Sequence, residues 1–427
     1  MAKSCGATQP GADRFSYPFS ATAPVSADAL DCDVLVVGAG PAGSACARWL
    51  ALHGKRVILA DAHTFPRDKT CGDALIPDAL SALAKLGVLD AVRAKAQPVE
   101  WALCVASKAG AVDVPGEMAV LPRKELDALL ANAATQAGAQ LLTPWRLEGL
   151  LQTQERVCGA ELSNAGARIS VKAPWVVLAT GAAAKPLLAS GMCTQREPDY
   201  MALRGYVRLN NAPSGFERLQ FFWHPLLSGG YGWIFPAGPG LYNVGVGYET
   251  ALLKRRKQDA NNKEPNLREL FALFVKASPE ARLLHEQGEW VGELKGAPMR
   301  CNLAGTQWGR AGLLLAGEAA GSTFAFTGEG IGKALETGMA CAEALLQGES
   351  DAATLQAQRS AYETLLPRYT LYRKAQHFNR WPWMIDLTIW KARRSPRIVR
   401  ALSDVLHERR MPGSLLSWRG LRALLFY

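Results

Sequence analysis

The segment from residue 33 to 61 constrains the fold of this chain more than any other. It begins with an apolar run of strand type, Val34–Val37, and then turns sharply at the glycine-rich stretch G-A-G-P-A-G of residues 38–43. A helical composition follows, and a second apolar run at 56–60 ends at Asp61. A glycine-rich turn between a strand and a helix holds phosphate groups against free backbone N–H groups and the positive end of the helix dipole. The segment therefore predicts a dinucleotide-binding unit rather than an ordinary tight turn.

Each residue type in this unit has its own task. Gly38 allows the turn, Gly40 lets a pyrophosphate approach bare backbone, and Gly43 lets the helix pack closely on the strand. An acid at the end of the second strand accepts hydrogen bonds from ribose hydroxyl groups. The cofactor-binding residues predicted here are Gly38, Gly40, Pro41, Ala42, Gly43 and Asp61.

The chain has 427 residues, enough for two or three domains. Its 49% hydrophobic and 20% charged residues are typical of a globular protein. The nine cysteines are scattered without a C-x-x-C pair, which indicates the reducing cytoplasm and predicts no metal site. Residues 1–30 lack the apolar block of a signal peptide, so we expect a disordered leader. No apolar stretch is long enough to span a membrane.

The net charge of +10 is concentrated in one part of the chain. Residues 367–427 contain thirteen Lys or Arg and three acidic residues, so the whole excess lies there. Trp381, Trp383, Trp390 and Trp418 are interleaved with these cations. Such a segment suits either the anionic inner face of a membrane, to which the protein would attach peripherally, or a helical cap with a solvated basic face. Nucleic acid is not expected as a partner, because no nucleic-acid-binding module is visible.

A second motif, F-P-R-D-K-T-C-G-D at residues 65–73, follows the second strand and so runs close to the bound dinucleotide. Arg67 and Lys69 can neutralise phosphate or an anionic cofactor ring, and the backbone around Gly72 can approach the cofactor. Cys71 has two interpretations. It is either a thiol that ionises near cationic groups and reacts, or a small buried filler.

Smaller signals follow along the chain. Residues 74–86 have a helical pattern, 99–121 alternate as strands do, and 122–137 again have a helical pattern. Arg123 lies at the start of this last helix, and we expect it to reach the cofactor, with an exposed surface arginine as the alternative. The apolar run W-V-V-L-A-T-G-A contains Gly181 at its end, where a parallel sheet lets a ligand pass close to the backbone.

Residues 190–300 have a different character, with aromatic side chains on short strand-like runs. In the run G-Y-G-W-I-F-P, strict alternation places Tyr231, Trp233 and Phe235 on one face of a sheet. These rings form either ordinary core or the wall of a long apolar pocket. We favour the pocket, because the flanking glycines offer little for the rings to pack against.

A third motif lies at residues 311–332. An apolar run ends at Gly317 and Glu318, and T-G-E-G-I-G then begins a helix at Gly330 and Ile331. Glu318 is placed to hydrogen-bond the sugar-alcohol chain of a flavin, and the N–H groups at the helix start would stabilise negative charge on the reduced ring. The distance between the first and third motifs indicates a nucleotide-binding fold that is split by an inserted domain.

The motifs occur in one order over residues 33–345, and this order carries a resemblance. The chain resembles the FAD-dependent superfamily of para-hydroxybenzoate hydroxylase type in G-A-G-P-A-G with Asp61, R-D-K-T-C-G, L-P-R-K-E-L-D, V-L-A-T-G-A and L-A-G-E-A-A-G…T-G-E-G-I-G. The K-T-C-G loop, the Y-G-W-I-F-P strand and the C-terminal tail are similar to those of the geranylgeranyl reductase family, whose members hydrogenate isoprenoid double bonds in lipids, quinones and pigment side chains.

The resemblance implies a role for each matched residue. The glycines of the first motif would bind the pyrophosphate of FAD, and Asp61 would bind the adenosine ribose of FAD. Arg123, at the start of its helix, would contact the cofactor. The flavin ring and ribityl chain would be lined by Cys71, Gly72, Asp73, Glu318, Gly330 and Ile331, and the substrate channel by Tyr231 and Trp233. With the residues singled out above, the expected cofactor site also includes Arg67, Gly181 and Gly317, and the substrate site includes Phe235.

Two positions depart from the pattern of the family. Glu318 stands where the family usually has Asp, which lengthens the reach to the ribityl chain and keeps the acceptor. Ser228 stands at the first proline position of the family strand P-x-x-Y-x-W-x-F-P, which leaves the shape of that turn and the substrate open.

The resemblance also implies a reaction. Reduced FAD would deliver a hydride to one carbon of an isoprenoid double bond, and Cys71 or bound water would protonate the other. Because the chain has one dinucleotide fingerprint, transient NAD(P)H or a reduced carrier protein would supply electrons. The alternatives are an FAD-dependent monooxygenase of an aromatic or apolar small molecule, and a membrane-associated flavoprotein quinone reductase. The W-x-W-x-I-P strand of flavin halogenases is absent, as are the clustered cysteines of an iron–sulfur site.

The expected fold is a mixed α/β one. A Rossmann-like FAD-binding domain is split by an inserted antiparallel-sheet substrate domain, and a helical C-terminal segment follows. We assign residues 31–98, 120–182 and 305–346 to the FAD-binding domain. Residues 99–119 and 183–304 form the substrate-binding domain, and residues 347–427 form the basic C-terminal segment.

Overall fold

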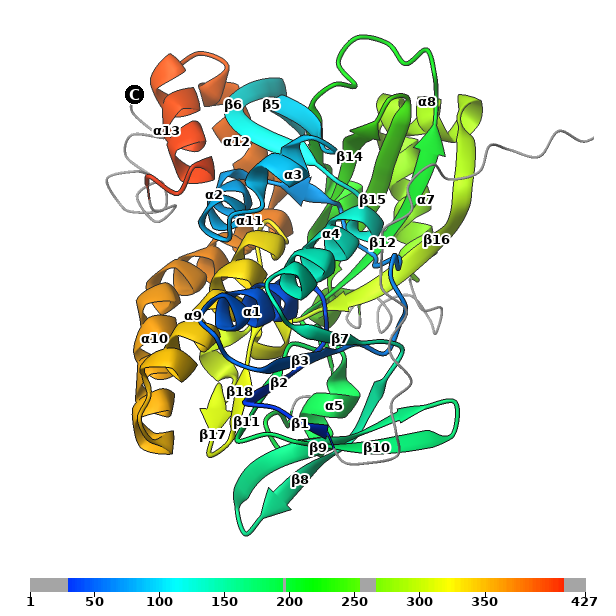
Figure 1. Cartoon of the computed structure of the whole chain (residues 1–427). Coiled ribbons are helices and arrows are strands. Elements are labelled where there is room, and N and C mark those ends of the chain that lie inside the picture. The colour runs from blue at the N-terminus through cyan, green and yellow to red at the C-terminus, as the bar shows by residue number, and fades with distance from the viewer. Residues whose placement is uncertain (1–29, 195–196, 254–265, 411–427) are drawn as a thin grey trace, which may run out of the picture.

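The computed structural model describes residues 30–194, 197–253 and 266–410. Within this part of the chain there are three β-sheets, and most of the helices lie along the central and the eight-stranded sheets (Figure 1). The mixed α/β class, with a nucleotide-binding fold split by an inserted antiparallel sheet, is confirmed. The expectation for residues 1–29 lies outside the described residues, and Leu30 already forms the first residue of a strand. The domain boundaries given above remain a prediction.

The central sheet has six strands, of which five run parallel and the edge strand β17 runs antiparallel. Its middle strand β2 is fully buried, and Val36 lies in register between Val177 on one side and Leu59 on the other. Near-continuous apolar runs are what a parallel sheet covered on both faces requires. In spatial order the strands are β17 (Gly309–Arg310), β18 (Leu313–Leu315), β11 (Trp175–Leu178), β2 (Val34–Val37), β3 (Val57–Ala60) and β7 (Gln140–Leu142).

Helices cover this central sheet. The first helix, α1, packs between α4 and α9, and α10 packs on the far side of α9 (Figure 1). Small residues allow the close approach of α1 and α9, since a β-carbon on Gly338 would lie 2.2 Å from the carbonyl oxygen of Ala42. The helices of this part are α1 (Pro41–Leu52), α2 (Pro77–Lys85), α3 (Leu89–Arg93), α4 (Arg123–Gln136), α9 (Ile331–Gln347) and α10 (Asp351–Ala375).

The second sheet has eight strands and is mostly antiparallel. It joins segments that are far apart in sequence, because the hairpin β5–β6 pairs through β13 with the strands of residues 200–299. Two short helices, α7 (Leu267–Ala277) and α8 (Pro279–Gln287), pack against β12. The strands in order are β16 (Glu289–Met299), β12 (Tyr200–Arg208), β15 (Leu241–Glu249), β14 (Gly230–Gly238), β13 (Leu219–Trp223), β5 (Gln97–Ala106), β6 (Gly110–Val120) and β4 (Ala74–Leu75).

The third sheet is small and lies below the central one in Figure 1. Among the described residues, one pair of its strands is parallel, and in that pair Leu30 lies opposite Val171. The short helix α5 (Ala184–Ala189) lies against its strand β8. The sheet consists of β1 (Leu30–Asp31), β10 (Ala167–Lys172), β9 (Arg156–Asn164) and β8 (Arg146–Thr153).

The C-terminal segment is helical as far as it is described. After α10, the helices α11 (His377–Arg380), α12 (Pro382–Ala392) and α13 (Pro396–Leu406) turn back onto the eight-stranded sheet. The helix α12 packs against both strands of the hairpin β5–β6, and α13 packs against β6. The chain end that holds Trp418 lies outside the described residues. No helix of the described ranges is both long and apolar enough to cross a membrane.

One local expectation is wrong. The helical pattern of residues 74–86 does not start at Ala74, because Ala74 and Leu75 form β4 and pair with Val120 and Ala119. The helix α2 begins only at Pro77, whose fixed φ suits a first helical turn. Short apolar stretches cannot be assigned from composition when a strand edge is available nearby.

Candidate functional site

The glycine-rich turn holds α1 tightly against the central sheet. Gly38 has a φ of +105°, and a β-carbon there would lie 2.3 Å from the carbonyl oxygen of Ala179. A β-carbon on Gly43 would lie 1.7 Å from the carbonyl oxygen of Gly38. Neither position accepts a side chain. Gly40 is the N-cap of α1 and offers no side-chain cap, so the N–H groups of the first turn are available to a ligand.

Two guanidinium groups converge on the same helix start. A β-carbon on Gly40 would lie 3.6 Å from Nη2 of Arg123 and 3.7 Å from Nη2 of Arg67. Arg123 donates from Nε and Nη2 to the buried carboxylate of Asp127 at 2.6 and 2.9 Å, and Nη1 of Arg67 lies 3.0 Å from the same group. Nη2 of Arg67 also lies 3.5 Å from Asp61, so two carboxylates face the two cations, and what they offer a ligand beside Gly40 is guanidinium N–H groups rather than surplus charge. Nε of Arg67 is buried without a hydrogen-bond partner among the described residues. This cradle fits the pyrophosphate of a dinucleotide.

Asp61 lies at the end of β3, as the sequence predicts, and is 6% exposed. Its two oxygens accept the backbone N–H groups of Ala39 at 2.9 Å and His63 at 3.0 Å. The carboxylate therefore braces the glycine-rich turn. It also lines the cavity described below, where it retains lone pairs for a ribose.

The loop of residues 65–73 is tied to the aromatic strand β14 through one amide. Asn243, on β15, accepts the indole N–H of Trp233 at 2.9 Å and donates to the carbonyl oxygen of Cys71 at 2.8 Å. The backbone of the loop touches the strand as well, because a β-carbon on Gly72 would lie 3.0 Å from the Phe235 ring. The loop and the substrate-side strand thus form one rigid wall.

Asp73 anchors the end of this loop. Its carboxylate accepts hydrogen bonds from Nδ2 of Asn243 at 2.7 Å, the backbone N–H of Arg123 at 3.2 Å and the hydroxyl group of Tyr206. Burial raises the pKa of Asp73 to about 6, although these hydrogen bonds oppose the shift. The side chain is fully engaged by the protein, so its visible task is to shape the loop, and a direct contact with a cofactor stays a prediction.

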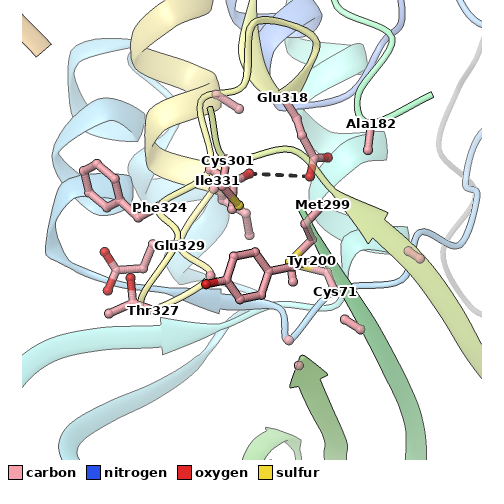
Figure 2. Close-up of a pocket in the computed structure, with 18 of the residues that line it drawn as sticks. Cys71, Ala182, Tyr200, Met299, Cys301, Glu318, Phe324, Thr327, Glu329 and Ile331 are labelled. Carbon is pink, nitrogen blue, oxygen red and sulfur yellow. Dashed lines mark hydrogen bonds between the residues drawn. The ribbon is translucent and has the colours of Figure 1, made fainter. Parts of the chain in front are cut away.

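The thiol of Cys71 lies on the pocket side of this loop (Figure 2). Burial raises its pKa, and the positive charge of Arg123 opposes that shift. The group is therefore a thiol at neutral pH rather than a thiolate. It could give up a proton to a neighbouring atom, but it is not arranged as a nucleophile.

The third motif faces the loop from the other side. Glu318 reaches into the same pocket as Cys71, Tyr200 and Ile331 (Figure 2). Its Oε1 accepts the backbone N–H of Arg300 at 3.2 Å, and burial raises the pKa of its carboxyl group. Gly330 is the N-cap of α9 and again offers no side-chain cap. The N–H groups of this helix start are available to an electron-rich ligand.

The motifs border one cavity of about 1010 Å³. The glycine-rich turn, Arg67 and Arg123 lie at its polar end. Tyr231, Trp233 and Phe235 follow on β14, with neighbouring ring centroids 6.2 Å apart. The cavity then continues between the hairpin β5–β6 and the C-terminal helices, where Thr388, Arg397 and Arg410 also line it but most of the lining is apolar: Ala102, Cys104, Val112, Val114, Met118, Ile385, Ile389, Ile398, Ala401, Leu402, Val405 and Leu406. An apolar chain would fit this second part.

The structure brings nearly all predicted site residues to this cavity. Gly43 and Gly317 are the exceptions. Gly43 packs on Gly38, and Gly317 packs on α1, with its absent β-carbon 2.6 Å from that of Ala42. The predicted residues that line the cavity are Gly38, Gly40, Pro41, Ala42, Asp61, Arg67, Cys71, Gly72, Asp73, Arg123, Gly181, Glu318, Gly330, Ile331, Tyr231, Trp233 and Phe235. Their cofactor and substrate contacts remain predictions.

Three features of the site do not follow from the sequence reasoning. Asp127 holds both arginines, and its spacing of four residues from Arg123 within a helical pattern is the signal that could have found it. Asn243 is a polar residue inside an apolar strand, which is a sign of a buried hydrogen-bond network. The apolar wall formed by α12 and α13 has no sequence signal, because it depends on how distant elements pack.

Comparison with known proteins identifies a matching family profile and relatives of similar length. A family profile described as an FAD binding domain matches residues 31–219. The menaquinone reductase of Mycolicibacterium smegmatis is 31% identical over 336 residues, which cover 74% of this chain and 76% of that protein. The digeranylgeranylglycerophospholipid reductase of Methanosarcina acetivorans is 30% identical over 338 residues, with 74% and 76% covered.

Solved structures show the same fold. A geranylgeranyl bacteriochlorophyll reductase-like protein of Thermoplasma acidophilum has a TM-score of 0.73 at 21% identity, covering 91% of this chain and 99% of that one. A flavin-dependent brominase also has a TM-score of 0.73, at 18% identity, covering 92% and 97%. At these identities the likeness concerns the fold alone.

The fold, the cradle and the profile match define an FAD-dependent oxidoreductase of the hydroxylase-type superfamily. The relatives at 30% identity or more narrow this class further. The chain belongs to the geranylgeranyl reductase family.

Proposed function

We propose that this flavoprotein reduces carbon–carbon double bonds of an isoprenoid or related lipid-like substrate. The observation that carries the proposal is the shape of the cavity. A polar cradle for a dinucleotide opens directly into an apolar channel that is walled by β14, the hairpin β5–β6 and the helices α12 and α13. The relatives named above act, by their names, on a quinone and on a geranylgeranyl lipid. An apolar chain that lies in the channel would place a double bond beside Cys71 and the start of α9, where the resemblance to the family places the flavin ring.

Different residues of the chain would have different roles in such a reaction. Arg67, Arg123 and the start of α1 would bind the pyrophosphate, and the start of α9 would stabilise negative charge on the ring. Bound FAD, once reduced, supplies hydride chemistry. The apolar wall would exclude water and orient the alkene, and Cys71, held as a thiol, would deliver a proton to the second carbon. Electrons would reach the flavin from NAD(P)H that visits transiently, or from a small carrier protein.

An anaerobic experiment tests this proposal. The flavin of the purified protein is reduced with dithionite, a digeranylgeranylglyceryl phospholipid or a menaquinone is added, and flavin reoxidation is followed together with substrate mass. Reoxidation with a gain of two hydrogen atoms per double bond, retained after exposure to air, would support the proposal. A mass gain that air reverses would indicate reduction of the quinone ring instead. Reoxidation only when oxygen enters, with an oxygenated product, would favour a monooxygenase.

The proton donor is tested by substitution of Cys71. Loss of alkene reduction in Cys71→Ala, with FAD still bound, would support the thiol as donor. Unchanged reduction in this variant would show that Cys71 is only a loop residue and would indicate bound water as the proton donor.

A further inference from the structure

The helix α12 has two different faces. Its inner face is buried, and there Ile385 and Ile389 line the apolar channel. Its outer face carries Trp383 and Trp390, which are seven residues apart and therefore lie on the same side of the helix. These two side chains are 62% and 45% exposed. The helix is thus a thin partition between the channel and the outer surface, with apolar side chains on both sides.

The outer face is extended by a third tryptophan and by cations. Trp381, directly before α12, is 51% exposed. From residue 391 to 400 the chain has five Lys or Arg and no acidic residue. Arg394 lies over Trp390, with its guanidinium carbon 4.2 Å from the ring centroid. We call Trp381, Trp383, Trp390, Lys391 and Arg394 the α12 face.

The acidic residue of α12, Asp386, comes three residues after Trp383 and four before Trp390, so it lies on the same side of the helix. It accepts the backbone N–H groups of Lys108 and Ala109 at 2.7 and 2.9 Å, which ties α12 to the tip of the hairpin β5–β6. Its single negative charge is smaller than the two positive charges of Lys391 and Arg394. The α12 face therefore combines large exposed rings with a net positive charge.

This combination selects one kind of partner. Tryptophan is favoured at the boundary between lipid headgroups and acyl chains, and Lys and Arg add attraction to anionic lipids. Large exposed rings that are grouped on one face mark an interaction site rather than ordinary surface. The channel behind the same helix is apolar, which suits a substrate that leaves a bilayer.

We propose that the α12 face docks on the surface of a membrane that contains anionic lipids, and that docking presents the channel to substrate dissolved in the bilayer. The presentation of substrate from the bilayer rests on the function proposed above. Docking on the membrane does not, since it concerns binding alone.

Vesicle sedimentation tests the docking with the FAD-loaded full chain. We expect binding to vesicles of phosphatidylcholine mixed with phosphatidylglycerol, and much weaker binding to phosphatidylcholine alone or in high salt. The double variant Trp383→Ser, Trp390→Ser should bind at least about tenfold more weakly, and Lys391→Glu with Arg394→Glu should lose the dependence on anionic lipid. Equal flavin content and circular dichroism establish that the variants are folded.

Trp101→Ser is the matched control. Trp101 is also exposed, but its neighbour Ala102 lines the channel, so the indole lies on the opposite face of β5. This variant should bind vesicles as the unchanged protein does. Unchanged vesicle binding in the double tryptophan variant would overturn the proposal. So would tight binding of a DNA duplex together with no vesicle binding.

Activity separates this proposal from the proposed function. With geranylgeranyl diphosphate in solution, the double tryptophan variant should turn over as fast as the unchanged protein, and with lipid in vesicles it should be several-fold slower. Vesicle binding without any alkene reduction would overturn the proposed function and leave the docking surface intact. If the double tryptophan variant reduced lipid in vesicles as fast as the unchanged protein, the docking proposal would be overturned and the proposed function would stand.

Discussion

Asp127 holds Arg123 in place from one helical turn further along α4, through hydrogen bonds of 2.6 and 2.9 Å to Nε and Nη2. The carboxylate is fully buried and also serves Arg67. Both guanidinium groups therefore keep fixed positions above Gly40. A cradle that is organised before its ligand arrives binds with a smaller ordering cost.

Replacement of Asp127 by Asn should remove the buried counter-charge of Arg123 and leave Arg67 with Asp61 alone, 3.5 Å from its Nη2. We expect FAD affinity to fall by at least about tenfold, and stability to fall by about 3 kcal/mol. Flavin titration and thermal unfolding measure the two effects. Asp351→Asn is the matched control, because Asp351 pairs with Arg156 in the same two-bonded way at a partly exposed site outside the cavity lining. Equal effects of both substitutions would contradict a special role for Asp127.

A methyl group at Gly43 should separate α1 from β2, because its carbon would meet the carbonyl oxygen of Gly38 at 1.7 Å. We expect Gly43→Ala to lower stability by at least about 2 kcal/mol and to abolish retention of FAD during purification. Gly296→Ala serves as the control, since a β-carbon there would meet no atom closer than 3.6 Å and the residue lies outside the cavity lining. Normal flavin content in Gly43→Ala would show that the turn can relax.

Removal of the amide at Asn243 should uncouple the loop of residues 65–73 from β14. In Asn243→Leu the indole of Trp233 loses its acceptor and the carbonyl oxygen of Cys71 loses its donor. We expect a loss of about 1–3 kcal/mol in stability and slower alkene reduction, measured by unfolding and by anaerobic flavin reoxidation. A variant that is destabilised but reduces substrate at the normal rate would limit Asn243 to a structural task.

The pH dependence of stability should reflect Glu329. Burial, and then the nearby carboxylates of Asp78 and Glu408, raise the pKa of Glu329 to about 8, against the opposing charge of Lys333. A carboxyl group with a raised pKa keeps its proton in the folded state where the unfolded chain loses it, so stability falls as pH rises through this range.

Thermal unfolding of the protein between about pH 5 and pH 9 measures this effect. The midpoint should decrease with rising pH, and Glu329→Gln should flatten the curve above about pH 6, while Asp73, whose pKa burial raises to about 6, keeps a slope below that. Glu286→Gln, at an exposed position of α8, should leave the curve unchanged. A flat curve for the unchanged protein would show that Glu329 ionises normally.

Much of this architecture follows from local patterns in the sequence. The glycines of the first motif, the position of Asp61 and the alternation of Tyr231, Trp233 and Phe235 are set by neighbouring residues, so the pattern is sufficient to place them. Asn243 and the α12 wall depend on contacts between segments more than a hundred residues apart, and no local pattern encodes such contacts. The start of α2 lies between these cases, because pairing with β6 overrides the helical composition of Ala74 and Leu75.

The helices α12 and α13 close the channel, and they are also made late in protein synthesis. Synthesis proceeds from the N-terminus, so every predicted cofactor residue up to Ile331 leaves the ribosome before α12 begins at Pro382. Until then the hairpin β5–β6 lacks its cover, and the aromatic strand β14 borders an open trough. The growing chain therefore passes through an interval in which apolar surface is exposed to water and aggregation competes with folding.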